Sequence, residues 1–151
     1  MPFITVRQAV LCDLDACAVL FDEYRQFQGR ESDLPAARAF IRARVDHGES
    51  VIFLAYEGDT PLGFTQLYPI FSSVSMARVF ILNDLFVREA GRRKGVASHL
   101  LNAAEAYARE LGAVRLSLVA AVDNVSAHQL YESRGWKPDQ QFVAYHQALQ
   151  S

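Results

Sequence analysis

The chain has 151 residues, of which 51% are hydrophobic and 21% are charged, and its formal net charge is −2 at pH 7. These values predict one globular domain over residues 1–151 and argue against a nucleic-acid-binding protein, which is usually strongly basic. No apolar run is long enough to cross a bilayer and the N-terminus lacks a signal-peptide pattern, so we expect a cytoplasmic protein that acts at no membrane.

The first half of the chain predicts strands and helices that alternate in short blocks. Asp13 and Asp33 are suited to cap the N-termini of two helices. A Glu-Gly-Asp-Thr turn at residues 57–60 indicates a β-hairpin. In order, the expected elements are a strand at 3–7, helices at 13–26 and 33–47, and strands at 50–56, 61–68 and 77–87.

The second half predicts a long amphipathic helix followed by shorter elements. Residues 96–111 carry apolar side chains at helical spacing and end at Gly112, a common C-terminal cap. Residues 116–122 have the unbroken apolar character of a buried central strand. A short helix at 125–134 and a closing strand at 142–149 complete the chain.

This order of elements predicts an α/β fold with a mixed sheet. Antiparallel hairpins come first, and a strand–helix–strand unit follows. The strands of that unit, residues 77–87 and 116–122, should pair in parallel. A right-handed crossover through the helix between them is the default connection.

The junction after residue 87 combines a strand end, a glycine-containing turn and the start of a helix. Unpaired N–H groups and the helix dipole attract anions at such a junction, and Arg92, Arg93 and Lys94 add three positive charges. The Walker and dinucleotide-binding glycine motifs are both absent. The junction therefore predicts a site for a polyphosphate group, with a solvated basic turn as the alternative.

Arg92-x-x-Gly95-x-Ala97 resembles the [Q/R]-x-x-G-x-[G/A] signature of the GNAT superfamily of N-acetyltransferases. The resemblance implies that backbone amides of this loop hold the pyrophosphate of coenzyme A (CoA), and that the preceding strand pairs with its pantetheine arm. Arg93 stands where many members have a second glycine, and Ala97 replaces a commoner glycine. The CoA-binding residues implied in this way are Leu85, Phe86, Val87, Arg92, Arg93, Lys94, Gly95, Val96, Ala97 and Asn124.

A second motif, Asn124-x-x-Ala127-x-x-Leu130-Tyr131-x-x-x-Gly135-Trp136, resembles another block of the same superfamily. By that resemblance Tyr131 is the general acid that protonates the departing CoA thiolate. The same resemblance places Asn124 against the pantetheine arm. A plain N-cap is the alternative role of this asparagine.

Asp84 is the candidate for the group that takes a proton from the acceptor amine or orients it. Diamine and polyamine acetyltransferases of the superfamily resemble residues 82–87 but carry Glu-Asp where this chain has Asn83-Asp84. The glutamate proposed as base in that subgroup is thus an amide here. This puts polyamine specificity in doubt and leaves the base open, with a structural hydrogen-bonding role for Asp84 as the alternative.

The resemblance implies a mixed, mostly antiparallel twisted sheet of about six to seven strands, with a central parallel pair splayed at the CoA site, and about four helices. It also implies acetyl-CoA as cosubstrate, no metal, a small-molecule primary amine as acceptor, and a homodimer, for which residues 142–149 offer an edge. Three alternatives stay open: acetylation of protein lysines or N-termini, CoA binding without turnover, and nucleic-acid binding through residues 92–94.

Overall fold

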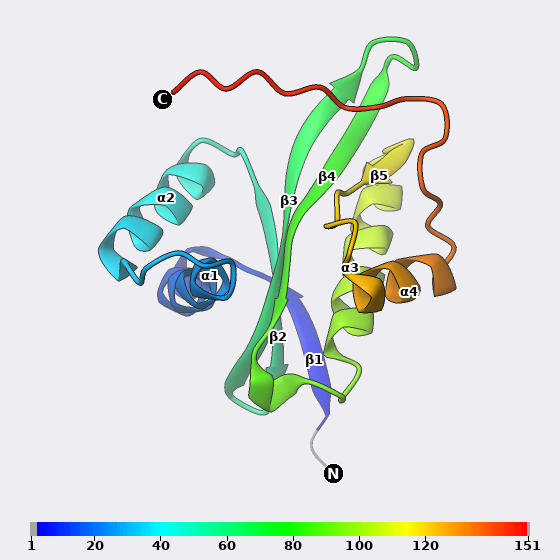
Figure 1. Ribbon diagram of the computed structural model, residues 1–151. Coiled ribbons are helices and arrows are strands. Elements are labelled where there is room, and N and C mark those ends of the chain that lie inside the picture. The colour runs from blue at the N-terminus through cyan, green and yellow to red at the C-terminus, as the bar shows by residue number, and fades with distance from the viewer. Residues whose placement is uncertain (1–2, 151) are drawn as a thin grey trace. The chain divides into compact units, whose positions relative to one another are not determined.

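The computed structural model describes residues 3–150, which fall into two compact units, residues 3–118 and 119–150. The first unit holds a five-stranded sheet and three α-helices (Figure 1). In chain order its elements are β1 (Ile4–Gln8), α1 (Leu14–Phe27), α2 (Leu34–Asp46), β2 (Val51–Glu57), β3 (Thr60–Ser72), β4 (Ala77–Val87), α3 (Val96–Glu110) and β5 (Arg115–Ser117), with 3-10 turns at Leu11–Asp13 and Glu89–Gly91.

The sheet has the order β1-β2-β3-β4-β5, so strands that follow one another in the chain are also neighbours in the sheet. The first three pairs are antiparallel, and β4 pairs with β5 in parallel. Helices α1 and α2 lie on one face and α3 lies on the other, which makes three layers (Figure 1). The mixed sheet and its parallel pair joined through a helix confirm the fold class expected from the sequence.

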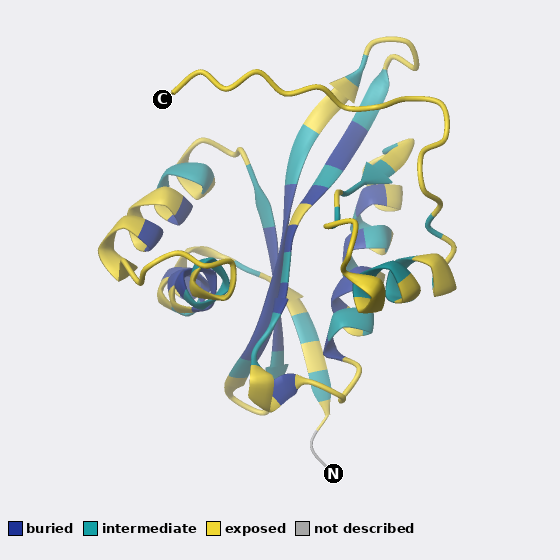
Figure 2. Cartoon of the chain, in the orientation of Figure 1, coloured by how far each residue is buried: buried dark blue, intermediate teal, exposed yellow. Residues whose placement is uncertain are grey.

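The core lies on both faces of this sheet (Figure 2). Leu20 of α1, Ile41 of α2 and Leu54 of β2 are fully buried between the helix pair and the sheet. On the opposite face, Leu100 and Leu101 of α3 are fully buried as well. The helical spacing of apolar residues therefore predicts correctly which side of α3 faces the sheet.

The two aspartates expected as helix caps behave differently. Asp33 caps α2 as expected, because its side chain accepts a hydrogen bond from the Ala36 backbone N–H at 3.2 Å. Asp13 occupies the N-cap position of α1, but its carboxylate bonds to the Val10 backbone N–H at 2.8 Å and to Arg7 at 2.5 Å. Asp13 therefore ties α1 to the end of β1 and does not cap its own helix through the side chain.

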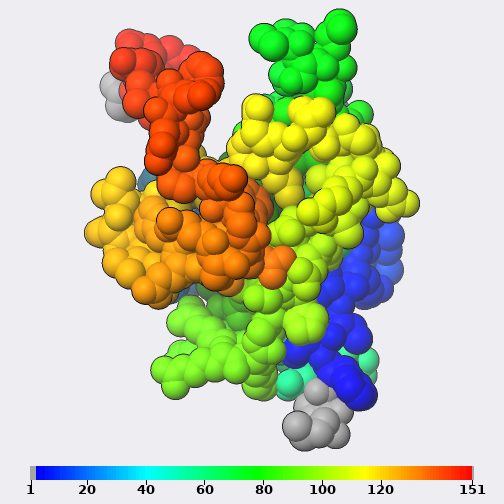
Figure 3. Space-filling model, turned by 90° about the vertical axis from the view of Figure 1, so that its right-hand side faces the viewer, coloured from blue at the N-terminus to red at the C-terminus, as the bar shows by residue number. Residues whose placement is uncertain are grey.

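The hairpin of β3 and β4 is longer than the sequence predicted. Strand β3 continues to Ser72, beyond the expected end at residue 68, and the tip of the hairpin projects from the sheet (Figure 3). Val74 and Met76 at this tip are 98% and 92% exposed. The additional residues therefore form a hairpin end that extends beyond the core.

The sequence-based expectations for the end of the sheet are wrong in three respects. The sheet has five strands, not six to seven, and the parallel pair lies at its edge, not at its centre. Strand β5 has only three residues, and residues 142–149 form no strand. The unbroken apolar run at 116–122 suggested a strand buried between two neighbours, but Val119 and Val122 are 96% and 95% exposed.

The physical reason is that an apolar run becomes a central strand only when a strand pairs with it on each side. Beyond β5, nothing in residues 118–150 joins the sheet. The alternating side chains of Phe142, Val143 and Tyr145 stay 74–91% exposed. Apolar character alone therefore overstated both the length of β5 and the number of strands.

The second unit contains helix α4 (Val125–Ser133). Asn124 caps this helix through its side chain, which accepts a hydrogen bond from the Ala127 backbone N–H at 3.2 Å. None of the described residues from 119 to 150 is buried (Figure 2). Across residues 3–150, no helix has both the length and the apolar character needed to cross a membrane.

A substitution at Gly63 tests the tight packing of β3 against β4. A Cβ at this position would lie 2.6 Å from the Phe86 backbone oxygen, so Gly63→Ala must displace one of the two strands. We expect a loss of about 1–3 kcal/mol in the free energy of unfolding, measured by urea denaturation. The control Thr60→Ala, at an exposed position of the same strand, should change it by less than about 0.5 kcal/mol. An equal effect of the two substitutions would contradict this packing.

Candidate active site

The candidate site begins at an irregularity in β4. The pairing of β3 with β4 shifts by one residue, because Gln66 lies opposite Asp84 while Leu67 lies opposite Leu82. Asn83 is therefore the extra residue of a β-bulge. Bulges redirect side chains, and here the bulge places Asp84 on the same face as Phe86, beneath α1.

Asp84 is a buried acid held by neutral hydrogen-bond donors. Its side chain is 3% exposed and accepts hydrogen bonds from Gln66 Nε2 at 2.5 Å, from Asn83 Nδ2 at 3.1 Å and from the Tyr24 side chain. Burial raises the pKa of Asp84, and the three hydrogen bonds act in the opposite direction. The net result is a carboxyl group whose pKa lies above the ordinary value and which can exchange a proton nearer neutral pH.

Asp84 lies at one side of a cavity of about 300 Å³ that is formed entirely within the first unit. Aromatic rings make its walls: Phe21 and Phe40 stack with centroids 5.5 Å apart. Tyr68 also lines the cavity, and burial, followed by the charge of Asp84, raises its pKa to about 12. The lining residues are Phe21, Tyr24, Arg25, Gln28, Arg30, Phe40, Tyr68, Asn83 and Asp84.

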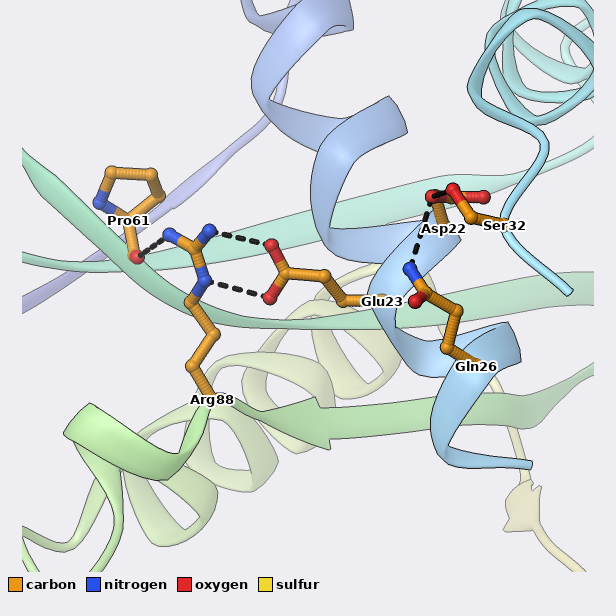
Figure 4. Close-up of polar contacts among 6 residues, drawn as sticks. All are labelled: Asp22, Glu23, Gln26, Ser32, Pro61 and Arg88. Atoms are coloured by element: carbon orange, nitrogen blue, oxygen red, sulfur yellow. Dashed lines mark hydrogen bonds and ion pairs between the residues drawn. The ribbon is translucent and has the colours of Figure 1, made fainter. Parts of the chain in front are cut away.

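An ion pair holds the end of β4 against α1. Arg88 follows β4 directly, and its guanidinium donates to both carboxylate oxygens of Glu23, at 2.8 and 2.5 Å (Figure 4). The same guanidinium donates to the Pro61 backbone oxygen at 3.1 Å. A two-point arginine–carboxylate contact fixes orientation as well as distance. It therefore sets where the loop after β4 begins relative to the cavity wall.

The loop after β4 has an unusual backbone. Arg93 and Gly95 both have positive φ angles, 65° and 77°. A Cβ at Gly95 would lie 3.8 Å from the His99 ring, an ordinary contact distance, so the φ angle and not lack of room explains the glycine there. Arg93 keeps the left-handed conformation that a glycine would adopt freely, at a cost of about 1–2 kcal/mol. The backbone at residue 93 therefore has the conformation that suits a glycine, although this chain has an arginine there.

The same turn leads into an uncapped helix. Gly95 is the N-cap residue of α3, and no side chain caps this helix end. The first N–H groups of any α-helix lack partners inside the helix and carry the positive end of its dipole. Left-handed residues next to right-handed ones, as at Arg93 and Gly95, can also turn backbone N–H groups toward one point. The turn and the first turn of α3 together form what we call the cradle, residues 92–97, and its chemistry suits a phosphate group.

The three cations of the cradle are not equivalent. Lys94 pairs with Glu57 at 3.1 Å, which partly neutralises it. Arg92 donates to the Val87 backbone oxygen at 3.2 Å and stacks over the Phe27 ring at 5.4 Å. The sequence suggested three cations around one anion, but two of them are already engaged with the protein. The backbone N–H groups therefore remain the main anion-binding element.

A buried aspartate holds the loop between α1 and α2. Asp22 is 5% exposed and accepts hydrogen bonds from Ser32 Oγ at 2.7 Å and from Gln26 Nε2 at 3.1 Å (Figure 4). It also accepts a hydrogen bond from the Asp33 backbone N–H at 2.8 Å. These bonds lower the pKa of Asp22, with the Ser32 contact as the largest cause. The loop they fix carries Arg30, one of the residues that line the cavity.

Strand β4 brings together most of the residues expected at the site. Asp84 lies beside the cavity, residues 85–87 complete the strand, and residues 92–97 follow as the cradle. Asn124 and Tyr131 lie in the second unit. There Tyr131 is partly buried, which raises its pKa, and its ring lies 5.8 Å from that of Trp136. Within residues 3–150, no three His, Cys, Asp or Glu side chains form a cluster suited to a metal.

Sequence reasoning missed several residues of the site, among them Gln66, Tyr68 and Arg30. Gln66 is fully buried and donates to Asp84, while its own Oε1 has no hydrogen-bond partner among residues 3–150. Its signal was present in the sequence, because it follows Phe64 by two residues and therefore shares the inward face of a strand. A glutamine at an inward position indicates a buried polar partner, which turns out to be Asp84.

Comparisons with known proteins identify the family of the chain. Residues 15–136 match the model of the Acetyltransferase (GNAT) family. "Uncharacterized N-acetyltransferase YhfO" of Bacillus subtilis (strain 168) is 49% identical over 142 residues, which are 94% of this chain and 95% of that protein. A "Probable acetyltransferase" of Haemophilus influenzae is 29% identical over 126 residues, 83% of this chain and 84% of that protein.

A solved structure described as a probable acetyltransferase has 45% sequence identity to this chain. It matches with a TM-score of 0.92 over 97% of this chain and 99% of that chain. The family match spans most of the sequence, and both the sequence and the structure comparisons extend over nearly its full length. The chain therefore belongs to the GNAT family of acetyltransferases.

Proposed function

We propose that this protein is an N-acetyltransferase that transfers the acetyl group of acetyl-CoA directly to a primary amine of a small molecule. Family membership supports acetyl transfer. The finer proposal is carried by one observation: a single strand, β4, bears the buried acid Asp84 beside a cavity and leads directly into the uncapped end of α3. A proton-exchanging group and an anion site thus lie on one continuous piece of chain.

The cradle fits the pyrophosphate of acetyl-CoA. Uncapped N–H groups at the start of α3 and the left-handed turn at residues 93–95 supply backbone donors, and Arg93 adds a positive charge. Acetyl-CoA supplies a thioester, whose acetyl group is activated toward attack by an amine. Residues 85–87 extend from the cavity to the loop before the cradle and would lie along the pantetheine arm.

The reaction needs proton transfers at the nitrogen and at the sulfur, and we assign one residue to each. Asp84 takes a proton from the acceptor ammonium, and the neutral nitrogen then attacks the thioester carbonyl carbon. A C–N bond forms and the C–S bond breaks, while the thiolate takes a proton from the Tyr131 hydroxyl. The second proton of the attacking nitrogen and the proton held by Asp84 pass to solvent, and solvent returns a proton to Tyr131. Burial raises the pKa of Tyr131, which keeps its phenol protonated and ready to donate. The products are an acetylated amine and free CoA.

The cavity has room for a small acceptor. About 300 Å³ lined by aromatic rings accommodates a compact amine, and the cavity opens to solvent. Acetylation of protein lysines or N-termini is the second candidate, because a flexible side chain can also enter such a cavity.

A cytoplasmic location and a homodimer that uses the exposed residues 142–149 stay predictions. Sedimentation as a monomer at micromolar concentration would contradict the homodimer.

Acetyl-CoA binding and turnover test the proposed function together. We expect heat of binding on titration with acetyl-CoA, and release of free thiol when amines are added to the same sample. The panel should contain small primary amines and lysine peptides. Binding without turnover on any of them would favour a CoA-binding module. No binding would show that the cradle does not hold CoA and would contradict the proposal.

Replacing the hydroxyl of Tyr131 tests its role as general acid. We expect Tyr131→Phe to lower kcat by about ten-fold or more, since positioned acids contribute at least that much, while acetyl-CoA affinity stays within two-fold. The matched control is Tyr145→Phe, because Tyr145 lies in the same unit and is 91% exposed. An unchanged kcat in Tyr131→Phe would remove this residue from the acid role.

A further inference from the structure

The acceptor cavity has an acid at one place and two cations at another. Asp84 is 3% exposed, whereas Arg25 is half-buried and Arg30 is exposed. Arg25 lies in the last turn of α1 and Arg30 in the loop that follows. All three line the same cavity, so its buried part is acidic and its solvent-facing rim is basic.

The two cations are not used by the protein in ion pairs. Within residues 3–150, neither Arg25 nor Arg30 has a carboxylate oxygen within salt-bridge distance, and neither is bonded to Asp84. The other arginines of the α1–α2 layer are paired: Arg38 with Asp15, Arg42 with Asp46, and Arg44 with Glu49. Arg25 does act on the charge of Asp22, but the oxygens of Asp22 already accept from Ser32, Asp33 and Gln26.

The rim is also held in place. The Arg30 backbone N–H donates to the Arg25 backbone oxygen at 2.9 Å, so the two residues are joined directly. Ser32, two residues further on, donates to the buried Asp22 (Figure 4). The backbone N–H of Asp33 donates to Asp22 as well. The backbone hydrogen bonds therefore hold Arg25 and Arg30 next to each other at the rim of the cavity.

Aromatic side chains make up much of the rest of the lining. Phe21 and Phe40 stack against each other, and Tyr24 and Tyr68 complete the aromatic lining. A ligand that matches this lining carries a nitrogen for Asp84, an apolar part for the rings and an anionic group for Arg25 and Arg30. A diamine or polyamine would instead place its second ammonium beside two arginines, which like-charge repulsion disfavours.

We propose that the acceptor is a small amine that also carries an anionic group, a carboxylate or a phosphate, and that Arg25 and Arg30 bind this group. The inference rests on the proposed function, because it names the class of amine that the same cavity accepts. It also accounts for Asn83, the residue before Asp84. Diamine and polyamine acetyltransferases carry a glutamate at this position, and this chain has an amide. The cavity has one acid beside the reacting nitrogen and none at the rim for a second ammonium.

Matched pairs of acceptors test the inference. Each pair shares its amine and chain length and differs in the anion: 4-aminobutyrate against butylamine, 6-aminohexanoate against hexylamine, and L-lysine against 1,5-diaminopentane. An aminoalkyl phosphate of the same lengths separates phosphate from carboxylate. We expect kcat/KM to favour the anionic member by about ten- to one-hundred-fold, as charge-assisted hydrogen bonds allow.

Variants at the rim assign the preference to residues. In Arg25→Gln/Arg30→Gln the ratio of kcat/KM between paired acceptors should fall toward one, through a higher KM for the anionic member. Arg25→Lys/Arg30→Lys should restore part of the ratio, since the charge returns without the two-point geometry. Arg42→Gln is the control, because Arg42 lies on α2, is paired with Asp46 and does not line the cavity. The single variant Arg30→Gln serves in case the double variant fails to fold, because Arg30 is exposed. It should lower the same ratio of kcat/KM.

The outcomes separate this inference from the proposed function. Turnover of uncharged amines or diamines at equal or higher kcat/KM would overturn the inference and leave the acetyltransferase in place. A preference for anionic acceptors that survives in the double glutamine variant would overturn the assignment to Arg25 and Arg30. Turnover of lysine peptides alone would overturn the small-acceptor inference. If no amine of any kind is acetylated, the proposed function fails and this inference fails with it.

Discussion

The site depends on one constraint: a carboxyl group that is buried but paired only with neutral donors. An ion pair would cancel the charge of Asp84 and leave nothing for a ligand, while burial without hydrogen bonds would cost several kcal/mol. Gln66, Asn83 and Tyr24 supply the hydrogen bonds without supplying a charge. The bulge at residue 83 makes this arrangement available, because it brings Asp84 under α1 in a strand that is otherwise regular. The rest of the first unit holds that geometry in place.

Other charged groups are arranged around this constraint with a clear division of roles. The Arg88–Glu23 pair fixes the end of β4 against α1, and Lys94 ties the loop that follows to Glu57 at the end of β2. Both ion pairs hold secondary-structure elements together, and none of their residues lines the cavity. Arg25 and Arg30 remain outside such pairs and face the cavity from its rim. Structural cations are thus neutralised by carboxylates, and those at the cavity are left for a ligand.

Local signals in the sequence predicted the first unit well, because each of its elements is decided by contacts close to it. The period of apolar residues gave α3 and its buried side, and the turn at residues 57–60 gave the hairpin. The cradle could be predicted because strand end, turn and helix start are contiguous in the chain, whereas Asp84 was singled out in the stretch that resembles diamine and polyamine acetyltransferases. What sequence reasoning missed depends on pairing between distant segments. The bulge opposite Gln66 and the isolation of β5 at the sheet edge are properties of two strands together, and neither strand shows them alone.

The pH dependence of kcat/KM in wild type and in Asp84→Asn tests the central claim most directly. If Asp84 accepts the proton of the acceptor amine, kcat/KM in the wild type rises with pH through a pKa above that of a free aspartate, since only the deprotonated form can act. Asp84→Asn should lose that rising limb and at least about ten-fold in kcat/KM, whereas the exposed control Asp59→Asn should keep both. An unchanged limb and an unchanged rate in Asp84→Asn would contradict the account.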